Sequence, residues 1–318
     1  MRASVIALLP LLFVSLAATA ADFADADFNG RWDIVVHKTP PDKAWWLEVS
    51  GAGTAAPKGR FVGFPGGDTN DIEQLSISDH VLHWTWRGKK GAPDLQYEAK
   101  YVNGNLEGQM TPATGEPIAF TAYRAPVIRD RDDGTWRRDE PVKLFNGANL
   151  DGWTSLEPGA TLGWTIENGV LKSTGHAANL ITNGRYWNFI LHAEYNVARG
   201  SNSGIGLRGR YEVQIQDDYG KPVESHINGA LYSRIKPLVN ASRPADQWQT
   251  VDIRLVGRDV SVTLNGKAII VRQPIEGLTA IAFSPFEAEP GAIELQGDHG
   301  PVEFRNFVLT PLYKSQNR

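Results

Sequence analysis

The chain has 318 residues, a formal net charge of -4 and a pI near 6.0, and its basic residues are scattered. Nucleic-acid binding needs a basic patch or stripe, so this composition excludes that class of protein. The chain has no cysteine, which excludes disulfides, thiolate chemistry and a lipidated cysteine.

The first 20 residues have the pattern of a cleavable secretory signal peptide. One basic residue precedes an apolar run from Val5 to Leu16, and small residues precede Ala21. This run is shorter than the roughly 20 apolar residues that span a bilayer, so a retained anchor is disfavoured. We expect cleavage after Ala20 and export across the inner membrane. The periplasm is the expected location, and the outer surface is the alternative.

Residues 27–126 are expected to form a first domain, a meander of about eight short strands. Strand-like runs lie at residues 31–37, 45–49, 59–64, 72–77, 81–87, 95–102, 106–110 and 118–124. Turn signals such as Asn103-Gly104 separate them, and we find no amphipathic helix after the signal peptide. This pattern favours an up-and-down barrel or half-barrel, with a sandwich as the alternative.

The first domain is rich in tryptophan: Trp32, Trp45, Trp46, Trp84 and Trp86. These rings could form a sugar-binding platform, because aromatic faces stack on the C–H faces of pyranoses. Large aromatic side chains more often fill the core of a small β domain, so we expect them there.

Residues 127–141 carry many charges of both signs and few apolar side chains. Such a segment is typical of an exposed connection between domains. We therefore expect a solvated, charged linker at the domain boundary.

Residues 142–312 continue as about a dozen short strands. The runs lie at residues 164–167, 169–173, 179–182, 189–197, 203–207, 211–216, 230–233, 249–256, 259–264, 268–272, 292–296 and 302–310. These strands are too many for one flat sheet. We expect an all-β protein whose second domain is an antiparallel jelly-roll sandwich with one concave sheet.

The clearest functional pattern lies in residues 202–217, which read as two strands joined at a glycine. Apolar and polar residues alternate there at the period of two that puts them on opposite faces. The polar set is Arg208, Arg210, Glu212, Gln214 and Gln216. On a concave face these groups would need partners, so we expect them to bind a small polyol.

Residues 204–209 also match the glycine pattern of dinucleotide-binding loops. That pattern requires a helix whose N-terminus receives the pyrophosphate, whereas here it leads into a strand. We therefore expect no nucleotide cofactor.

A series of separated motifs runs through residues 142–312. They are Leu144-Phe145-Asn146-Gly147, Asn202-Ser203-Gly204-Ile205, Tyr211-Glu212-Val213-Gln214-Ile215, Gly229-Ala230-Leu231-Tyr232, Asn240-Ala241-Ser242-Arg243-Pro244, Leu264-Asn265-Gly266 and Phe304-Arg305-Asn306. In this order they resemble the 3-keto-disaccharide hydrolase family, whose fold is similar to concanavalin A-like lectins and glucanases. The resemblance implies an enzyme on an oxidised sugar or glycoside, acting after a separate sugar 3-dehydrogenase.

Two positions depart from the family pattern. Trp248-Gln249 stands where the family often has Trp-Asn, which leaves an amide in place. The segment from Leu295 to Gly300 is similar to the family's Leu-Gln-Asp-His-Gly, with a glycine inserted between Gln296 and Asp298. The insertion changes the spacing of His299.

Cleavage of a 3-keto-glycoside follows from the acidity of the C2 hydrogen beside the C3 ketone. A base can form an enolate that expels the group on C1, after which water adds or the unsaturated product leaves. This route needs a base near C2, a cation or metal near the C3 oxygen, and an acid for the leaving oxygen. The candidates for proton transfer are Glu212, Glu194 and His299, and those for substrate binding are Arg208, Gln214, Asn202, Tyr232, Trp248 and Gln296. A divalent metal ion held by oxygen and imidazole ligands is a further hypothesis.

Several of these candidates have a structural alternative. Glu194 could form an ion pair with Arg208 or Arg210. Asn202 and His299 could be ordinary turn residues, and the aromatic candidates could belong to the core.

The function also has alternatives. A lectin-like protein would use the same face without turnover, since fold alone does not decide function. An ordinary retaining glycosidase would need two carboxylates about 5 Å apart. No such pair is evident on one strand, so this reading is minor. A structural role in the cell envelope is the third possibility.

Overall fold

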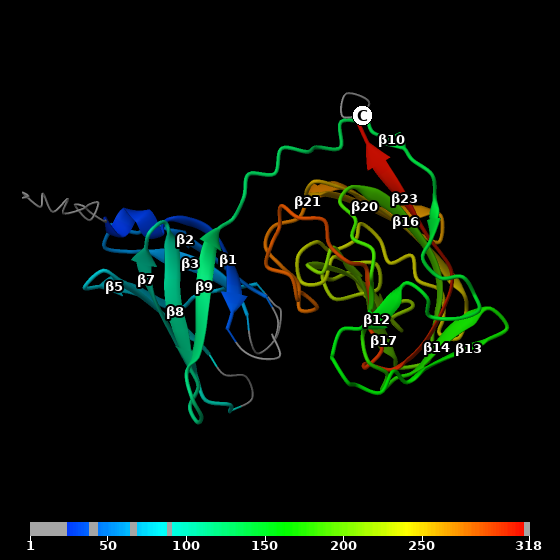
Figure 1. Ribbon diagram of the computed structural model, residues 1–318, viewed down its shortest axis with the longest axis horizontal. Helices are drawn as coiled ribbons and strands as arrows, with labels where there is room; N and C mark the ends of the chain where they lie inside the picture. The colour runs from blue at the N-terminus through cyan, green and yellow to red at the C-terminus, as the bar shows by residue number, and fades with distance from the viewer. Residues whose placement is uncertain (1–23, 38–43, 64–68, 88–90, 315–318) are drawn as a thin grey trace, which may run out of the picture.

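Figure 1 shows the computed structural model, in which two β-rich domains are joined by a long connecting segment. The structure describes residues 24–37, 44–63, 69–87 and 91–314, so the expected signal peptide lies outside the described residues. Within these ranges the only helix is a short 3-10 helix, η1 (Asp25–Phe28). No helix of the described chain is long and apolar enough to cross a membrane.

The first domain is a nine-stranded antiparallel sheet in the order β4-β3-β2-β1-β9-β8-β7-β6-β5. Its strands are β1 (Gly30–Val36), β2 (Trp45–Ser50), β3 (Lys58–Val62), β4 (Asn70–Asp71), β5 (Gln74–Ser78), β6 (Val81–Trp86), β7 (Leu95–Val102), β8 (Asn105–Thr111) and β9 (Ile118–Arg124). The edge strands β4 and β5 are separated by only two residues, so the sheet curls until its edges meet. The expected meander is therefore a barrel.

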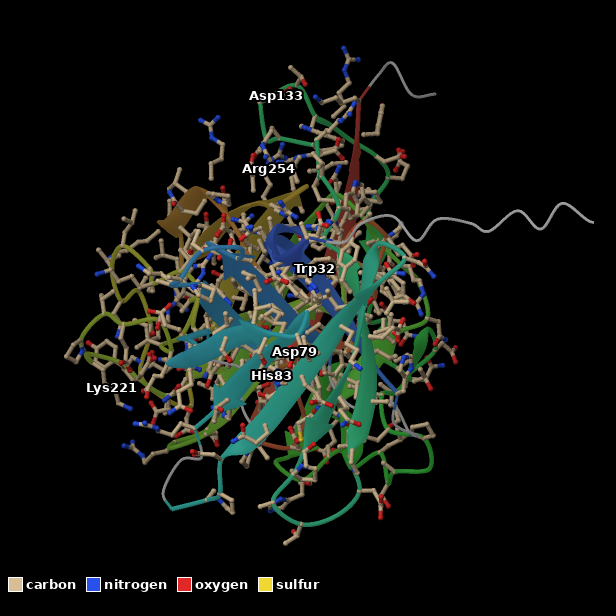
Figure 2. The ribbon with its side chains drawn as sticks, turned by 90° about the vertical axis from the view of Figure 1, so that its left-hand side faces the viewer. Trp32, Asp79, His83, Asp133, Lys221 and Arg254 are labelled. Carbon is tan, nitrogen blue, oxygen red and sulfur yellow. The ribbon has the colours of Figure 1, made fainter. Side chains whose placement is uncertain are left out.

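Aromatic side chains fill the interior of this barrel. Trp32, labelled in Figure 2, belongs to the buried core together with Trp45, Trp84 and Trp86. Trp84 stacks on Tyr97 with the ring centroids 5.0 Å apart. The expected core role of these tryptophans is confirmed, and their rings are not free to stack on a sugar. Trp46 is also buried, but it packs outside this core.

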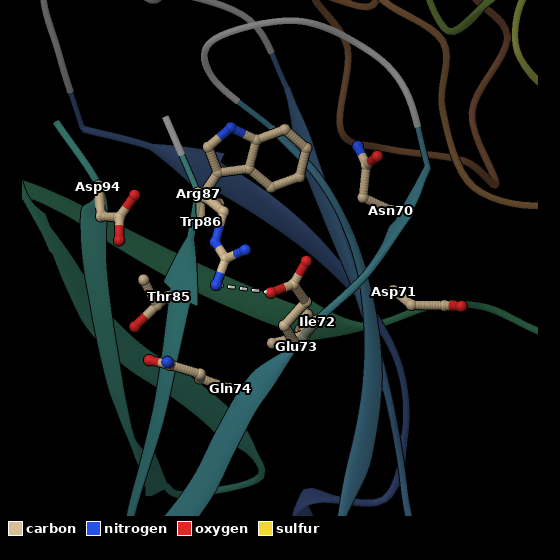
Figure 3. Close-up of a pocket in the computed structure, with 9 residues that line it drawn as sticks. All are labelled: Asn70, Asp71, Ile72, Glu73, Gln74, Thr85, Trp86, Arg87 and Asp94. Carbon is tan, nitrogen blue, oxygen red and sulfur yellow. Dashed lines mark ion pairs between the residues drawn. The ribbon is translucent and has the colours of Figure 1, made fainter. Parts of the chain in front are cut away.

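A pocket of about 170 Å³ opens at the seam where the barrel edges meet (Figure 3). The ion pair between Arg87 and Glu73, 3.0 Å long, lies in it. Trp86 is the one aromatic residue of its lining, and only 6% of that residue is exposed. The ring therefore offers no open platform, and all the lining residues belong to the first domain.

The second domain is an antiparallel β-sandwich. One sheet has the order β13-β14-β23-β16-β19-β20-β21, with β10 and β11 added along β23, and the other has the order β12-β15-β22-β17-β18. The strands are β10 (Arg137–Arg138), β11 (Val142–Lys143), β12 (Trp153–Ser155), β13 (Trp164–Glu167), β14 (Val170–Thr174), β15 (Leu180–Thr182), β16 (Phe189–Val197), β17 (Asn202–Leu207), β18 (Tyr211–Gln216), β19 (Gln249–Val256), β20 (Asp259–Leu264), β21 (Lys267–Pro274), β22 (Glu294–Leu295) and β23 (Pro301–Tyr313).

The core of the sandwich lies between the two sheets. Alternate residues of facing strands, such as Leu191 on β16 and Ile205 on β17, are fully buried in it. This alternation is what two sheets packed face to face require. The expected all-β jelly-roll fold is confirmed.

The segment 127–141 connects the domains, but it does not run free in solvent. Asp132 forms a bidentate ion pair with Arg254, with both contacts at 2.8 Å. Hydrogen bonds from Arg254 hold the pKa of Asp132 below its usual value. Asp130 accepts hydrogen bonds from Trp187 and Asn188, both at 2.8 Å. Most residues of the segment are exposed, as expected for a charged linker, and the second domain binds two of its carboxylates.

Candidate functional site

Three neighbouring strands of the smaller sheet build a polar face. Strand β17 lies between β18 and β22, and Gly206 pairs with Glu212 on one side and Glu294 on the other. Side chains at directly paired positions share one face of a sheet. Two glutamates therefore flank one glycine on the same face. With the same-face amides around them they form what we call the polar face: Asn202, Glu212, Gln214, Gln216, Glu294 and Gln296.

Two glycines of β17 make room for these carboxylates. A Cβ atom at Gly204 would lie 2.3 Å from Glu212 Oε1, and one at Gly206 would lie 3.0 Å from Glu294 Oε2. Both carboxylates therefore lean over β17. The glycines beneath them, Gly204 and Gly206, are two residues apart, which is roughly 7 Å along the strand.

The two glutamates of the polar face are buried: Glu212 is 3% exposed and Glu294 is 0% exposed. Burying carboxylates costs free energy, and apolar residues would serve folding better. Two carboxyl groups on one sheet face can instead serve as a general base and a general acid. We therefore take this pair as the centre of the candidate site.

Amide side chains flank the pair. Gln214 donates to Asn202 Oδ1 at 3.2 Å and to Gln216 Oε1 at 3.1 Å, which fixes its orientation. The side-chain oxygens of Gln214 and Gln296 are buried and accept no hydrogen bond from any residue that the structure describes. These oxygens can accept hydrogen bonds from the hydroxyl groups of a bound molecule.

An irregular segment borders the polar face along the free edge of β18. Gln214 exchanges backbone hydrogen bonds with Gly229 and Ala230, and the Tyr232 amide donates to the Glu212 carbonyl at 3.0 Å. The strand expected at residues 230–233 is present only as two isolated bridges of Leu231, to Val213 and to Ile235. Tyr232 is therefore fixed beside Glu212, and Arg234 follows two residues later, partly buried.

A buried hydrogen-bond network supports this border. Asp218 accepts from the Asn228 amide at 2.6 Å and from the Ser242 hydroxyl at 2.9 Å. Asn228 in turn accepts from the Tyr195 hydroxyl at 2.7 Å and donates to Gln249 at 3.3 Å. Burial raises the pKa of Asp218, and the hydrogen bonds from Asn228 and Ser242 offset this only in part. Gln249 stands where the family often has asparagine, and its side-chain amide belongs to this network.

Asp218→Ala should lower the free energy of unfolding by about 3 kcal/mol, because it leaves two buried donors without an acceptor. Urea denaturation measures this loss. Its neighbour Asp217 is less buried and accepts a hydrogen bond from the Gly200 amide. Asp217→Ala is the matched control and should cost less than about 1 kcal/mol. Equal losses in the two variants would contradict the role given to the network.

The predicted residue Glu194 lies on β16, in the other sheet. Its carboxylate accepts hydrogen bonds from Arg305 at 2.7 Å and from Asn306 at 2.6 Å. Burial opposes ionisation, but the hydrogen bonds from these two residues hold the pKa of Glu194 below its usual value. The Arg305 guanidinium also lies over the Trp248 ring, 3.9 Å from its centroid. Glu194 and Trp248 are thus neighbours of each other on the larger sheet, apart from the polar face.

Arg208 lies in the turn after β17 and not on the strand face that the alternation predicted. Its φ of 57° ends the period of two, and Arg210 lies in the same turn. The buried Arg208 guanidinium donates to the Gly257 carbonyl and lies over the Trp187 ring. Burial lowers the pKa of Arg208 to about 10. The turn directs this side chain away from the polar face, so the structure does not bring Arg208 together with Glu212. Substrate binding by Arg208 stays a prediction.

His299 lies at one end of the polar face. Its carbonyl accepts a hydrogen bond from the Asn202 amide at 3.3 Å, and its Nδ1 lies 2.6 Å from Asp298 Oδ1. The ring is about half exposed. Of the predicted residues, the structure thus brings together Glu212, Gln214, Asn202 and Gln296, with Tyr232 and His299 at the border.

Glu294 was missed in the sequence. The run Ile293-Glu294-Leu295-Gln296 has the alternation that places Glu294 and Gln296 on one face. That alternation could have identified Glu294, because Gln296 was itself a candidate. The pair forms across β18 and β22, so no single strand shows both carboxylates.

Metal binding needs several convergent ligands. Among the described residues, no group of three His, Cys, Asp or Glu side chains could hold a metal ion. The two carboxylates and the amide oxygens of the polar face are ligand types that Mg²⁺, Ca²⁺ or Mn²⁺ accepts, but only two of them carry charge. The divalent ion remains a prediction, and we derive no step through it.

The sandwich fold and the polar face agree with a carbohydrate-active enzyme, and the family match supports this class. Residues 140–310 match the sequence profile of the 3-keto-alpha-glucoside-1,2-lyase-like domain. The match covers more than half of the chain, so the protein belongs to this family. The resemblance seen in the sequence is confirmed.

Solved structures with similar folds include two provisionally assigned glycosyl hydrolases from Parabacteroides distasonis. They are 21% and 26% identical over 54% and 58% of this chain and 94% and 90% of their own, each with a TM-score of 0.47. A carbohydrate-binding module from Bacillus subtilis is 10% identical over 49% of this chain and 93% of its own, with a TM-score of 0.37. These TM-scores lie below 0.5, and the family assignment rests on the sequence match. No curated protein matches the chain significantly.

Proposed function

We propose that this protein is an exported enzyme that cleaves the glycosidic bond of 3-keto-glycosides, including 3-keto-disaccharides. The observation that carries the proposal is the buried pair of carboxylates, Glu212 and Glu294, leaning over the glycines of β17. Membership of a family named for a 3-keto-glucoside lyase supports the substrate class. A 3-keto-sugar needs a base and an acid but no strong nucleophile, which suits this pair.

In the proposed reaction Glu212 takes the proton from C2, and the negative charge spreads onto the C3 oxygen. The C1–O bond then breaks as the C1=C2 double bond forms, and the Glu294 carboxylic acid gives its proton to the leaving oxygen. Addition of water to C1 and return of a proton to C2 complete a net hydrolysis. Without the water step the unsaturated sugar is the product. Glu212 thus acts as the general base and Glu294 as the general acid.

The other residues of the site would bind and orient the sugar. The free amide oxygens of Gln214 and Gln296 would accept from its hydroxyl groups. Arg234, in the segment bordering β18, is our candidate for the cation near the C3 oxygen, and Tyr232 would form a wall of the site. His299, at the exposed end, would contact the leaving group.

The substrate must come from a separate dehydrogenase that oxidises the C3 hydroxyl of a glycoside. We propose the periplasm as the place of both reactions, on the basis of the leader-like first 20 residues. Cell fractionation with an antibody against the mature chain tests this location.

A chromogenic 3-keto-glucoside and its unoxidised parent test the proposed function. We expect release of the chromophore from the keto form alone. Release from the parent would indicate an ordinary glycosidase with Glu212 and Glu294 as its carboxylates. Binding of the keto form without release would indicate a lectin-like protein.

Gly204→Ala should impair this reaction, because the new methyl group would meet Glu212 Oε1 at 2.3 Å. The carboxylate must then move from its position over β17. We expect a loss in kcat/KM on the order of 100-fold and a loss in unfolding free energy of about 1–3 kcal/mol. Steady-state kinetics and urea denaturation measure the two effects. Unchanged kinetics would contradict the assignment of Glu212.

A further inference from the structure

We infer that the N-terminal barrel positions the strand that carries Glu212, and that Asp33 is the positioning residue through which it does so. The inference rests on the proposed function, since it gives the barrel a part in the same reaction. Two observations support it: a buried ion pair between Asp33 and Arg210, and the position of Arg210 in the turn between β17 and β18.

The ion pair joins the two domains. Asp33 lies on β1 of the barrel, and its Oδ1 is 3.0 Å from Nη2 of Arg210 in the second domain. The side chains are 6% and 1% exposed, so water screens this pair little. Loss of one partner would leave the other charge buried without its nearest counter-charge, which is unfavourable.

Arg210 lies in the turn between β17 and β18. It immediately precedes Tyr211, the first residue of β18, and is two residues before Glu212. The Arg210 amide donates to the Leu207 carbonyl at 3.1 Å, which closes the turn. A displacement of Arg210 is therefore transmitted through the chain to the start of the Glu212 strand.

Further contacts fix the same turn. The Arg210 guanidinium also donates to the carbonyls of Ser284 and Pro285, and its own carbonyl accepts from the Thr279 amide at 3.0 Å. The Tyr211 hydroxyl donates to Glu287 at 2.9 Å, and Glu287 forms an ion pair with Arg258. Among the described residues of the barrel, Asp33 is the one that the structure shows bound to the guanidinium of Arg210.

The surrounding interface keeps the barrel in contact with the second domain. Trp46 is buried in a cluster that contains Ala44 and Val62 from the barrel and Leu278 and Ala282 from the segment after β21. The Ala44 amide donates to the Ala282 carbonyl at 3.1 Å. In Figure 1 the orange segment that follows β21 extends toward β1.

The rim of this interface offers a matched control. Glu276 forms ion pairs with Arg31 at 2.8 Å and with Arg60 at 3.3 Å, but its side chain is 42% exposed. Exposed ion pairs contribute little because water and salt screen them. Glu276→Gln therefore removes a charge from the same interface without disturbing the turn at Arg210.

Hydrogen exchange of the full chain, followed by mass spectrometry, tests the inference without relying on turnover. In Asp33→Asn we expect the peptide covering residues 205–216 to exchange at least roughly tenfold faster, since its local opening becomes easier. Glu276→Gln should leave that peptide within about twofold of the wild type. If Asp33→Asn does not fold, Trp46→Leu loosens the same interface and should raise exchange in the same peptide.

Kinetics on a chromogenic 3-keto-glucoside provide the second readout. Asp33→Asn should lower kcat by about 10- to 100-fold while KM changes by less than about threefold, because the displaced base affects the reaction more than binding. If the wild-type protein does not cleave the 3-keto-glucoside but Asp33→Asn still exchanges faster in residues 205–216, the proposed function is refuted and the positioning role is supported. Unchanged exchange in residues 205–216, with only a lower melting temperature, would overturn the positioning role.

Discussion

Glu212→Gln is expected to lower kcat/KM on a 3-keto-glucoside by about 10³- to 10⁴-fold, since it removes the general base. The amide has nearly the same size as the carboxylate, so the contact over Gly204 and the fold should persist. Steady-state kinetics at neutral pH measure the loss, and thermal denaturation checks that the variant is folded.

Glu194→Gln is the matched control for this experiment. Both glutamates lie on strands of the second domain, but Glu194 is bound by Arg305 and Asn306 on the other sheet. We expect its activity to stay within about threefold of the wild type, because the substitution lies away from the site. Equal losses in Glu212→Gln and Glu194→Gln would contradict the placement of the active site on the smaller sheet alone.

Glu294→Gln is expected to have the second large effect, and its size should depend on the leaving group. In a 3-keto-disaccharide the departing sugar alkoxide is a poor leaving group and needs the acid, so kcat/KM should fall by about 10²- to 10³-fold. A nitrophenol leaves readily without protonation, so its release should fall by less than about tenfold. Comparison of the two substrates therefore separates the acid from the base.

The double variant Glu212→Gln/Glu294→Gln tests whether the two carboxylates act as a unit. Residues that act together have non-additive effects, so the double variant should be little worse than Glu212→Gln alone. Equal losses of Glu294→Gln on both substrates would refute the role of Glu294 as the acid. Fully additive losses would refute joint action in one step.

The strands that carry the site could be predicted because their pattern is local. The alternation in Tyr211–Gln216 gave the strand its observed bounds and assigned Glu212 and Gln214 to one face. The same alternation failed at Arg208, where a positive φ starts a turn that residue type does not reveal. Strand faces follow from nearby residues, and turns between them depend on backbone conformation.

The neighbours of each strand could not be predicted, because pairing joins residues far apart in the chain. Glu294 reaches the site only because β22 pairs with β17, which lies about ninety residues earlier. Asp132 and Arg254 are likewise joined across the domain boundary. No local pattern specifies such partners, so the carboxylate pair and the bound linker had to come from the structure.

The most direct test of C2 deprotonation is the hydrogen content at C2 of the product formed in deuterated water. A 3-keto-disaccharide is cleaved by the wild-type enzyme, and the released sugar is examined at once by NMR, with unreacted substrate and free 3-keto-sugar as exchange controls. Deprotonation at C2 predicts a released sugar that carries deuterium at C2, or an unsaturated product with no hydrogen there. Complete retention of the original C2 hydrogen would contradict it, and would mean that the bond to C1 is broken without an enolate.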